Sequence, residues 1–177
     1  TRAYHLYLEL LDSAWSIRQS DEVVARRLER KATLDPANAG ADAVMLRMAG
    51  VPHRSWMMLN ELRFKFRRLW SAFFRRHHVL LCPAFGTAAL PHRQDGETWE
   101  RRITIDGRTI AYNDLLFWPG ITCGYHLPAS VVPIGMTGDG LPIGVQVAGP
   151  VFGDRTTLAA AGLLEQAGAA FKPPSGW

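Results

Sequence analysis

The serine and lysine side chains that could act together as nucleophile and base lie far apart in this sequence. Its lysines are Lys31, Lys65 and Lys172, and no two serines are adjacent. Ser130 lies in an apolar run, without the flanking glycines that expose a nucleophilic serine and without a lysine or histidine nearby in the sequence. We therefore interpret Ser130 as a structural residue of a strand and assign no catalytic residue to the chain.

Metal-binding and phosphate-binding patterns are also missing from the sequence. The spacings of the clustered ligand-type residues fit no zinc pattern; these residues are His53, His77, His78, His92 and Cys82. The segment Gly138-Asp139-Gly140 continues as Leu141-Pro142-Ile143, which breaks the G-x-G-x-x-G pattern of a phosphate loop, and a turn explains its glycines. We therefore expect no metal site in this chain.

The most regular pattern lies between residues 127 and 168. A short apolar run from Ala129 to Ile134 is separated by a glycine-rich turn from a second run, in which Ile143, Val145 and Val147 alternate with smaller or polar residues. Alternation with period two places these three branched side chains on one face of a strand, and we expect that face to meet the core. A helix then follows, so the segment is predicted to be a β–α unit of an α/β protein.

The remaining elements follow from hydrophobic spacing and from capping and turn residues. We expect helices over about residues 4–15, 21–32, 41–49, 55–77 and 154–167, a buried strand over 79–82, a hairpin over 102–110 and a short helix over 113–117. Ser20 can cap the second helix, and Asp106-Gly107 is typical of a type I′ hairpin turn. Pro119-Gly120 is expected to end the short helix, which leaves residues 118–127 as a loop.

The helix predicted from Ser55 to about His77 is basic, but it does not predict nucleic-acid binding. Its expected core-facing stripe consists of Leu59, Leu62, Phe66, Leu69 and Phe73. The basic residues spread around the rest of the circumference, so no exposed face interleaves basic and aromatic side chains. The net charge of +4 and the pI of about 9.4 come mainly from arginine, which is far more frequent than lysine. This basicity is weak evidence for a nucleic-acid partner.

Length and composition favour one globular unit, or a piece of a larger one. The chain has 177 residues, 47% hydrophobic and 20% charged. No apolar run approaches the roughly 20 residues of a membrane helix, and the first residues show no signal-peptide pattern, so we expect a cytoplasmic setting and no membrane partner. Cys82 and Cys123 lie far apart in apolar contexts and are expected to be buried free thiols.

Two segments carry more specific motifs. Between Leu127 and Gly168 the chain reads LPAxVxPxG, then GLPxGVQxxGPxxxD, then the predicted helix. Upstream, one helix leads into VLLCPAFGTAALPH, and that helix carries Trp56, Asn60, Arg63 and Trp70. Together these motifs resemble the amidase signature family, hydrolases of carboxylic amides. The resemblance covers residues 55–174 and implies an amide substrate.

The resemblance also implies a catalytic triad of Ser, cis-Ser and Lys in the N-terminal half of such enzymes, with both serines in a Gly/Ser-rich loop. This sequence lacks such a loop, and its only Ser-Gly pair, Ser175-Gly176, lies beside the C-terminus. We therefore expect the C-terminal part of an amidase, with the missing N-terminal half of the same protein as its partner. The implied acyl-enzyme route uses side chains alone, so no organic cofactor or metal is expected.

The predicted loop over residues 118–127 precedes the motif-bearing strand. Ligands of α/β proteins gather outside the carboxyl ends of central strands, and the resemblance implies that this region borders the substrate cavity. Trp118, Thr122 and Cys123 are accordingly candidates for the pocket wall. A role in packing is an equally good interpretation of these three side chains.

The sequence thus predicts an α/β fragment in which helices of residues 1–54 lead into the motif-bearing part, residues 55–174. Its strands are expected to complete a mixed central sheet begun upstream, so that the strands at 79–82 and 143–147 lack neighbours within this chain. Two alternatives stay open: the A subunit of a tRNA-dependent amidotransferase, and a non-catalytic binding or scaffold protein. Homo-oligomer formation and the identity of the amide also stay open.

Overall fold

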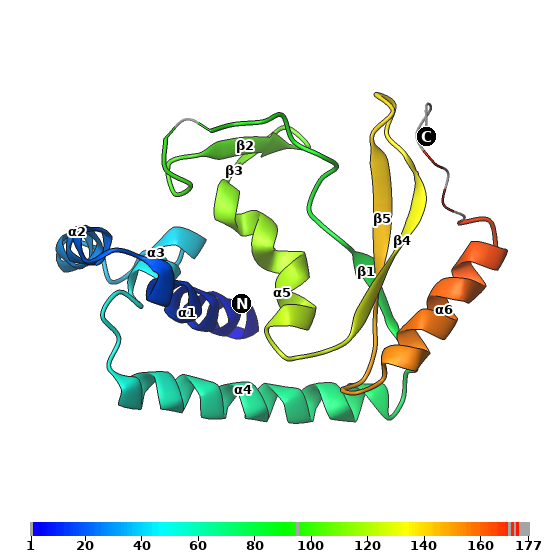
Figure 1. Ribbon diagram of the computed structural model, residues 1–177, viewed down its shortest axis with the longest axis horizontal. Helices are drawn as coiled ribbons and strands as arrows, with labels where there is room; N and C mark the ends of the chain where they lie inside the picture. Colours follow the sequence, from blue (N-terminus) through cyan, green and yellow to red (C-terminus); the bar gives the residue numbers. More distant parts are fainter. Residues whose placement is uncertain (1, 95, 170, 172, 174–177) are drawn as a thin grey trace.

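The structure is a computed structural model that describes residues 2–94, 96–169, 171 and 173. Helices dominate the N-terminal part and a small sheet dominates the C-terminal part (Figure 1). In chain order the elements are α1 (Arg2–Trp15), η1 (Ser16–Arg18), α2 (Asp21–Ala32), α3 (Ala41–Leu46), α4 (His53–Phe74), β1 (Leu80–Pro83), β2 (Arg102–Ile105), β3 (Arg108–Ala111), η2 (Tyr112–Leu116), α5 (Phe117–Cys123), β4 (Ala129–Met136), β5 (Pro142–Ala148) and α6 (Asp154–Gln166). The predicted α/β class is confirmed.

The main sheet has the strand order β1-β5-β4, and both pairings are antiparallel. Ala148 of β5 pairs with Leu80 on one side and with Ala129 on the other. The expectation that the strand at 143–147 lacks neighbours is therefore wrong, because this strand is the central one. Within the described residues, β1 and β4 are the edge strands, and a bulge between Pro133 and Gly135 interrupts the β4 ladder.

Helices cover the two faces of this sheet unevenly. The hydroxyl of Ser130 on β4 donates to that of Thr157 on α6 (3.2 Å), which places α6 against one face, while α5 reaches the other face through Gln146. Val147 is fully buried, whereas Val145 is half-buried and Ile143 is 38% exposed. The prediction that all three face the core is correct only at Val147, because the β4–β5 hairpin extends past both helices (Figure 1).

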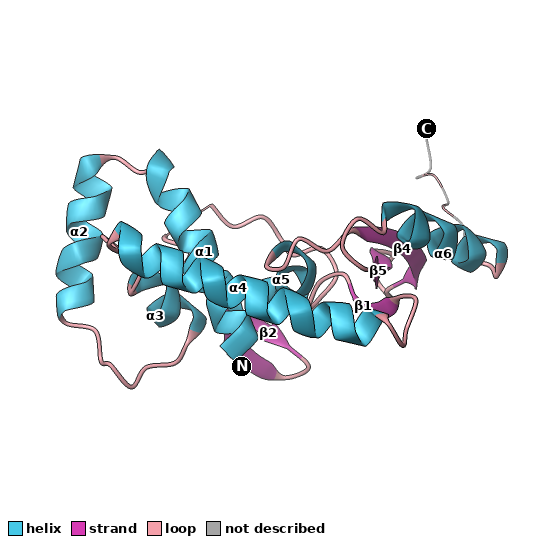
Figure 2. Cartoon of the chain, turned by 90° about the horizontal axis from the view of Figure 1, so that it is seen from below, coloured by secondary structure: helices cyan, strands magenta, loops and turns pink. Residues whose placement is uncertain are grey.

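The helical part has two clusters of core residues that share α1. Tyr7 and Leu8 pack against α3, and Leu6 and Leu10 pack towards α4. Helix α4 runs along the molecule from the helical part to β1 (Figure 2). None of the described helices combines the length and the apolarity needed to cross a membrane.

The core-facing stripe of α4 differs from the predicted one. The side chains that pack against the α1 core are Trp56, Leu59, Leu62, Phe66, Trp70 and Phe74. Leu69, placed in the predicted stripe, is 65% exposed. The stripe follows the i, i+4 row from Phe66 to Phe74, so that Trp70 and Phe74 take the places expected for Leu69 and Phe73.

The segment after the β2–β3 hairpin is more helical than predicted. The hairpin itself has the expected type I′ turn, with positive φ at both Asp106 (49°) and Gly107 (74°). Beyond it, η2 continues into α5, which runs through Pro119-Gly120 to Cys123, so the predicted helix stop and the loop over 118–123 are wrong. Pro119 lies in the first turn of α5, where no intrahelical bond requires its missing N–H.

Candidate functional site

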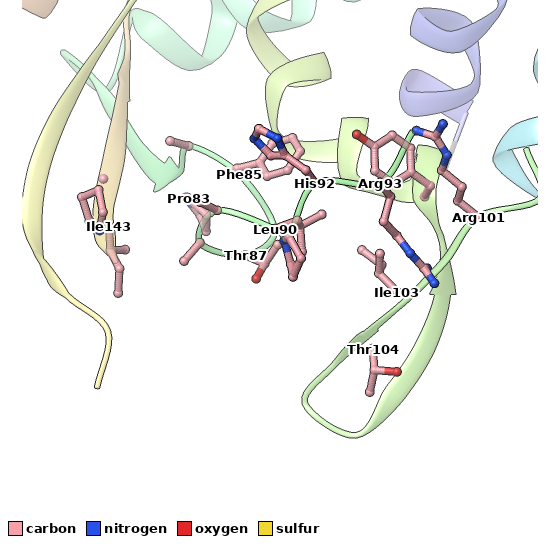
Figure 3. A pocket seen from close by; sticks show the side chains of 18 of the residues that line it. Pro83, Phe85, Thr87, Leu90, His92, Arg93, Arg101, Ile103, Thr104 and Ile143 are labelled. Carbon is pink, nitrogen blue, oxygen red and sulfur yellow. The ribbon is translucent and has the colours of Figure 1, made fainter. Parts of the chain in front are cut away.

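A cleft of about 1510 Å³ opens between the β1–β5–β4 sheet and the β2–β3 hairpin. The segment that follows β1, residues 84–94, crosses from the sheet to the hairpin and forms much of the cleft lining (Figure 3). This segment continues the LLCP sequence of β1, and the opposite wall comes from the motif-bearing strands β4 and β5. The two sequence segments that carry the specific motifs therefore line much of the cleft, and the hairpin lines the rest.

The sheet side of the cleft is apolar. Ile134, Pro142 and Ile143 come from the far part of the β4–β5 hairpin, and Phe85 and Leu90 come from the crossing segment. Ile143 and Phe85 keep 38% and 40% of their surface exposed, so they offer apolar surface to whatever enters the cleft. Such surface suits the hydrocarbon or aromatic part of a small organic ligand.

The hairpin side of the cleft is cationic. Arg93 Nη1 donates to the carbonyl of Arg102 (3.2 Å), and Arg102 Nη1 donates to the carbonyls of Trp99 (2.9 Å) and Arg101 (3.0 Å). The Arg101 guanidinium lies 5.9 Å from the centre of the Tyr112 ring, which also lines the cleft. No aspartate or glutamate is present among the described residues of the lining. Sequence reasoning missed these arginines, because Arg93 lies in a segment without periodicity and Arg102 lies at the start of the predicted hairpin, where spacing assigned it no role.

The three pocket candidates from the sequence lie beside the cleft rather than in its lining. Trp118 is half-buried, Thr122 is buried and Cys123 is exposed, all on α5. The expectation of burial is therefore correct for Cys82 and wrong for Cys123, which lies in the last turn of α5. The Thr122 hydroxyl donates to Gln146 Oε1 (3.1 Å), and Gln146 Nε2 donates to Cys82 Sγ (3.3 Å) and to the Trp118 carbonyl (3.5 Å). This buried polar network ties α5 to β5 and β1, and it reaches the cleft lining at Cys82.

Gln146 is a second residue that sequence reasoning missed. It is buried, with 5% of its surface exposed, and its amide joins three elements. A polar residue among the apolar positions of a strand was the available signal, since a buried amide requires hydrogen-bond partners. Alternation alone assigned it to the small and polar face of the strand, without a role.

Tyr7 of α1 packs against α5 at Gly120. A Cβ added at Gly120 would lie 2.5 Å from Tyr7 Cδ1, so α1 and α5 approach closely at this glycine. Burial raises the pKa of Tyr7 to about 12, and the neighbouring Cys123 thiol adds to the shift. Tyr125, just after α5, donates its hydroxyl to the Ala3 carbonyl (2.6 Å), and burial raises its pKa to about 12 as well.

The histidines singled out in the sequence lie on separate elements. His53 stacks on Trp56 at the start of α4, and His77 lies against Phe73 after its end. His92 lines the cleft. Within the described ranges, no three side chains of the types that bind metals come together.

Comparison with known proteins identifies a family match that contains the whole described lining of the cleft. A family model described as amidase matches residues 12–158, which includes both walls of the cleft and most of the helical part. The A subunit of glutamyl-tRNA(Gln) amidotransferase from Zymomonas mobilis is 31% identical over 130 residues, 73% of this chain and 24% of the relative. Acylamidase of Rhodococcus erythropolis is 34% identical over 82 residues, 45% of this chain and 16% of the relative.

Solved structures agree on the fold. A crystal structure of an amidase superposes with a TM-score of 0.60 at 17% identity, covering 93% of this chain and 35% of that one. A bacterial aryl acylamidase of the amidase signature family gives 0.55 at 21% identity, covering 86% and 34%. The chain therefore spans about a third or less of the length of these relatives and structures. Because the family model matches most of its residues, this chain belongs to the amidase signature family.

Proposed function

We propose that the complete protein hydrolyses carboxylic amides and that this chain supplies its C-terminal part, including one side of the substrate pocket. The observation that supports this proposal is the cleft, because both motif-bearing segments of an amidase family member contribute to its lining. Its described lining residues include arginines, threonines and a histidine but neither a serine nor a lysine. In the proposal, the nucleophile and its base come from the upstream half.

The proposed chemistry follows the acyl-enzyme route. A neutral lysine accepts a proton through a bridging serine, and the Oγ of the second serine bonds to the amide carbon while backbone N–H groups hold the oxyanion. The C–N bond then breaks and the nitrogen leaves as ammonia or an amine after receiving the proton. Water next attacks the acyl ester, which releases the carboxylic acid and restores the serine.

The lysines of this chain support the assignment of the catalytic groups to another segment. Lys31 Nζ donates to the Ala49 carbonyl (2.7 Å) between α2 and α3, and Lys65 is exposed on α4. Neither lines the cleft. Lys172 and the Ser175-Gly176 pair lie outside the described residues. We keep Trp118, Thr122 and Cys123 as proposed pocket-wall residues of the complete protein. In this proposal, the upstream half would complete the pocket beside them.

The test compares two proteins: the 177-residue chain alone, and the product of the complete reading frame that contains it. Both are assayed for ammonia release from acetamide and benzamide, with heat-inactivated protein as the control. Turnover only by the longer protein is the expected result. Turnover by the 177-residue chain alone would overturn the proposed division of labour, and no turnover of any amide by the longer protein would favour the non-catalytic alternative.

A second candidate is the A subunit of a tRNA-dependent amidotransferase, because several similar proteins are A subunits of glutamyl-tRNA(Gln) amidotransferases. In that reaction, ammonia freed from glutamine would be passed on rather than released. Pull-down of the complete protein from its own cells distinguishes the two. Stable co-purification with the other components of an amidotransferase, together with glutamine hydrolysis that depends on them, would favour the amidotransferase. Activity of the protein on simple amides without such components would favour the free amidase.

A further inference from the structure

The cleft is strongly asymmetric in charge. Arg93 lies beside the hairpin and Ile143 lies on the sheet side (Figure 3). Of the other lining residues, Arg102 belongs to strand β2 of the hairpin, and Ile134 and Pro142 belong to β4 and β5. None of the described lining residues is acidic, so none of them balances the positive charge of Arg93 and Arg102. A cleft lined by one sign of charge concentrates ligands of the opposite sign.

Both guanidinium groups are held in place and still have donors available. Each is anchored to backbone carbonyls, Arg93 on Arg102 and Arg102 on Trp99 and Arg101, through one nitrogen. A guanidinium carries five N–H donors in a rigid fork, so such anchoring leaves most of them for a ligand. Among the described residues, neither Arg93 nor Arg102 lies within 4.0 Å of a carboxylate oxygen.

The nearest candidate for an internal partner of Arg102 is already engaged. Arg102 lies close enough to Asp42 to lower the pKa of that carboxyl, although burial outweighs this effect. Asp42 Oδ1 accepts a hydrogen bond from Asn113 Nδ2 (2.6 Å), and Asp42 does not line the cleft. Among the residues that the structure describes, no acidic side chain lies in the cleft lining beside Arg93 and Arg102.

We infer that the amide substrate of this protein carries a carboxylate, which Arg93 and Arg102 bind, and an apolar body, which rests on the sheet side. This inference rests on the proposed function and names the substrate class of that site. Arginine binds carboxylates through paired, charge-assisted hydrogen bonds, which fixes both position and orientation. The scissile amide then lies between the two sides, where the upstream half would present its serine.

Matched substrates test the inference in the product of the complete reading frame. The pair is 4-acetamidobenzoate, which carries the carboxylate, and 4-methylacetanilide, in which a neutral methyl group replaces it. We expect kcat/KM to favour the carboxylate by about tenfold or more, and Arg93→Gln and Arg102→Gln each to remove about tenfold for the anionic substrate only. The preference should weaken as the salt concentration rises.

Two control variants make the result decisive. Arg108→Gln removes an exposed arginine of the same hairpin that does not line the cleft, and it should leave the preference unchanged. Arg93→Lys keeps the charge without the fork and should retain part of the preference, which separates lost recognition from lost folding. Equal rates on both substrates, or equal losses on both in Arg93→Gln, would overturn the inference.

Binding separates this inference from the proposed function. If the protein hydrolyses neither substrate, calorimetric titration with 4-acetamidobenzoate still measures the anion site. Saturable binding that is lost in Arg93→Gln and absent for 4-methylacetanilide supports the carboxylate site while the hydrolase proposal fails. Absence of binding to the folded wild-type protein overturns the carboxylate site.

Discussion

Val147 is the deepest side chain of the main sheet, and it offers the sharpest test of the β5 register. Val147→Asp would bury a carboxylate without a partner, which should lower the free energy of unfolding by about 3–5 kcal/mol. Ile143→Asp, on the same strand and the same face, is the control, because Ile143 is 38% exposed and the loss there should be about 1 kcal/mol. Urea denaturation measures both. Equal losses at the two positions would contradict the register.

Thr122 and Gln146, which share a buried hydrogen bond, should be energetically coupled. Thr122→Val leaves Gln146 Oε1 without its donor, and Gln146→Met leaves the Thr122 hydroxyl with only the Pro119 carbonyl. Each single substitution should cost about 1–3 kcal/mol, and the double variant should cost less than the sum. A double-mutant cycle in urea gives the coupling free energy. Strict additivity would show that this buried pair does not stabilise the contact between α5 and the sheet.

Two buried tyrosines predict a loss of stability in alkali. The pKa of Tyr7 and that of Tyr125 are each raised to about 12 in the folded chain from 10.0, chiefly by burial. Unfolding lets both phenols ionise near pH 10, so the stability they contribute is complete below pH 10 and is lost as the pH rises towards 12. The free energy of unfolding should fall over this interval, and the fall should be shallower in the Tyr7→Phe, Tyr125→Phe double variant. An identical fall in both proteins would contradict the assignment.

Helix α5 approaches α1 so closely at Gly120 that any side chain at this position would clash with Tyr7. A Cβ at Gly120 would lie 2.5 Å from Tyr7 Cδ1 and 2.8 Å from Tyr7 Cε1. Gly120→Ala should therefore cost about 1–3 kcal/mol through overpacking. Gly162→Ala in α6 is the matched control, because nothing lies within 4 Å of its added Cβ, and it should stabilise by about 0.5–1 kcal/mol. Thermal unfolding of the two variants should shift in opposite directions.

Elements whose ends depend on local chemistry were predictable from the sequence. The Ser20 side chain accepts from Val23 N at the start of α2, and Asp106 and Gly107 take the expected positive φ angles. The stop at Pro119-Gly120 was predicted wrongly, because a tertiary contact decides it. Gly120 is not a breaker here but the position where Tyr7 meets α5.

The candidate site was less predictable than the fold. Arg93 lies in a segment with neither helical nor strand periodicity, and Arg102 lies at the edge of a small hairpin. The two arginines share one side of the cleft only because the crossing segment places the hairpin opposite the sheet. Residue spacing in the sequence does not indicate this tertiary arrangement, whereas the family motifs did identify the strands that form the opposite wall.

The molecule as a whole leaves large apolar side chains uncovered. Helix α4 has no fully buried residue in 22, and Met58 and Leu69, which lie eleven residues apart on one side of it, are each 65% exposed. Leu158 and Leu163 of α6 are similarly exposed, at 64% and 66%. Several large apolar side chains exposed on one helix suggest an interaction surface, and these surfaces suit a covering segment from a longer protein.

One substitution measured in two proteins tests this covering. Leu69→Lys should change the free energy of unfolding of the 177-residue chain by no more than about 0.5 kcal/mol, because the side chain is exposed. In the product of the complete reading frame the same substitution should cost more than about 2 kcal/mol, since it would bury a lysine in place of a leucine. A small effect in both proteins would mean that the upstream half does not cover this side of α4.

The position of β5 between β1 and β4 has a consequence for synthesis on the ribosome. The ladder between β1 and β5 can form only after Ala148, the partner of Leu80, has been synthesised. The crossing segment and the hairpin are synthesised between these two residues. At roughly 5–20 residues per second, that delay is on the order of 3–14 s, during which β1 lacks β5 as a partner. We therefore expect the nascent chain to expose an edge of β1 to chaperones until β5 emerges, and only then can the cleft acquire its second wall.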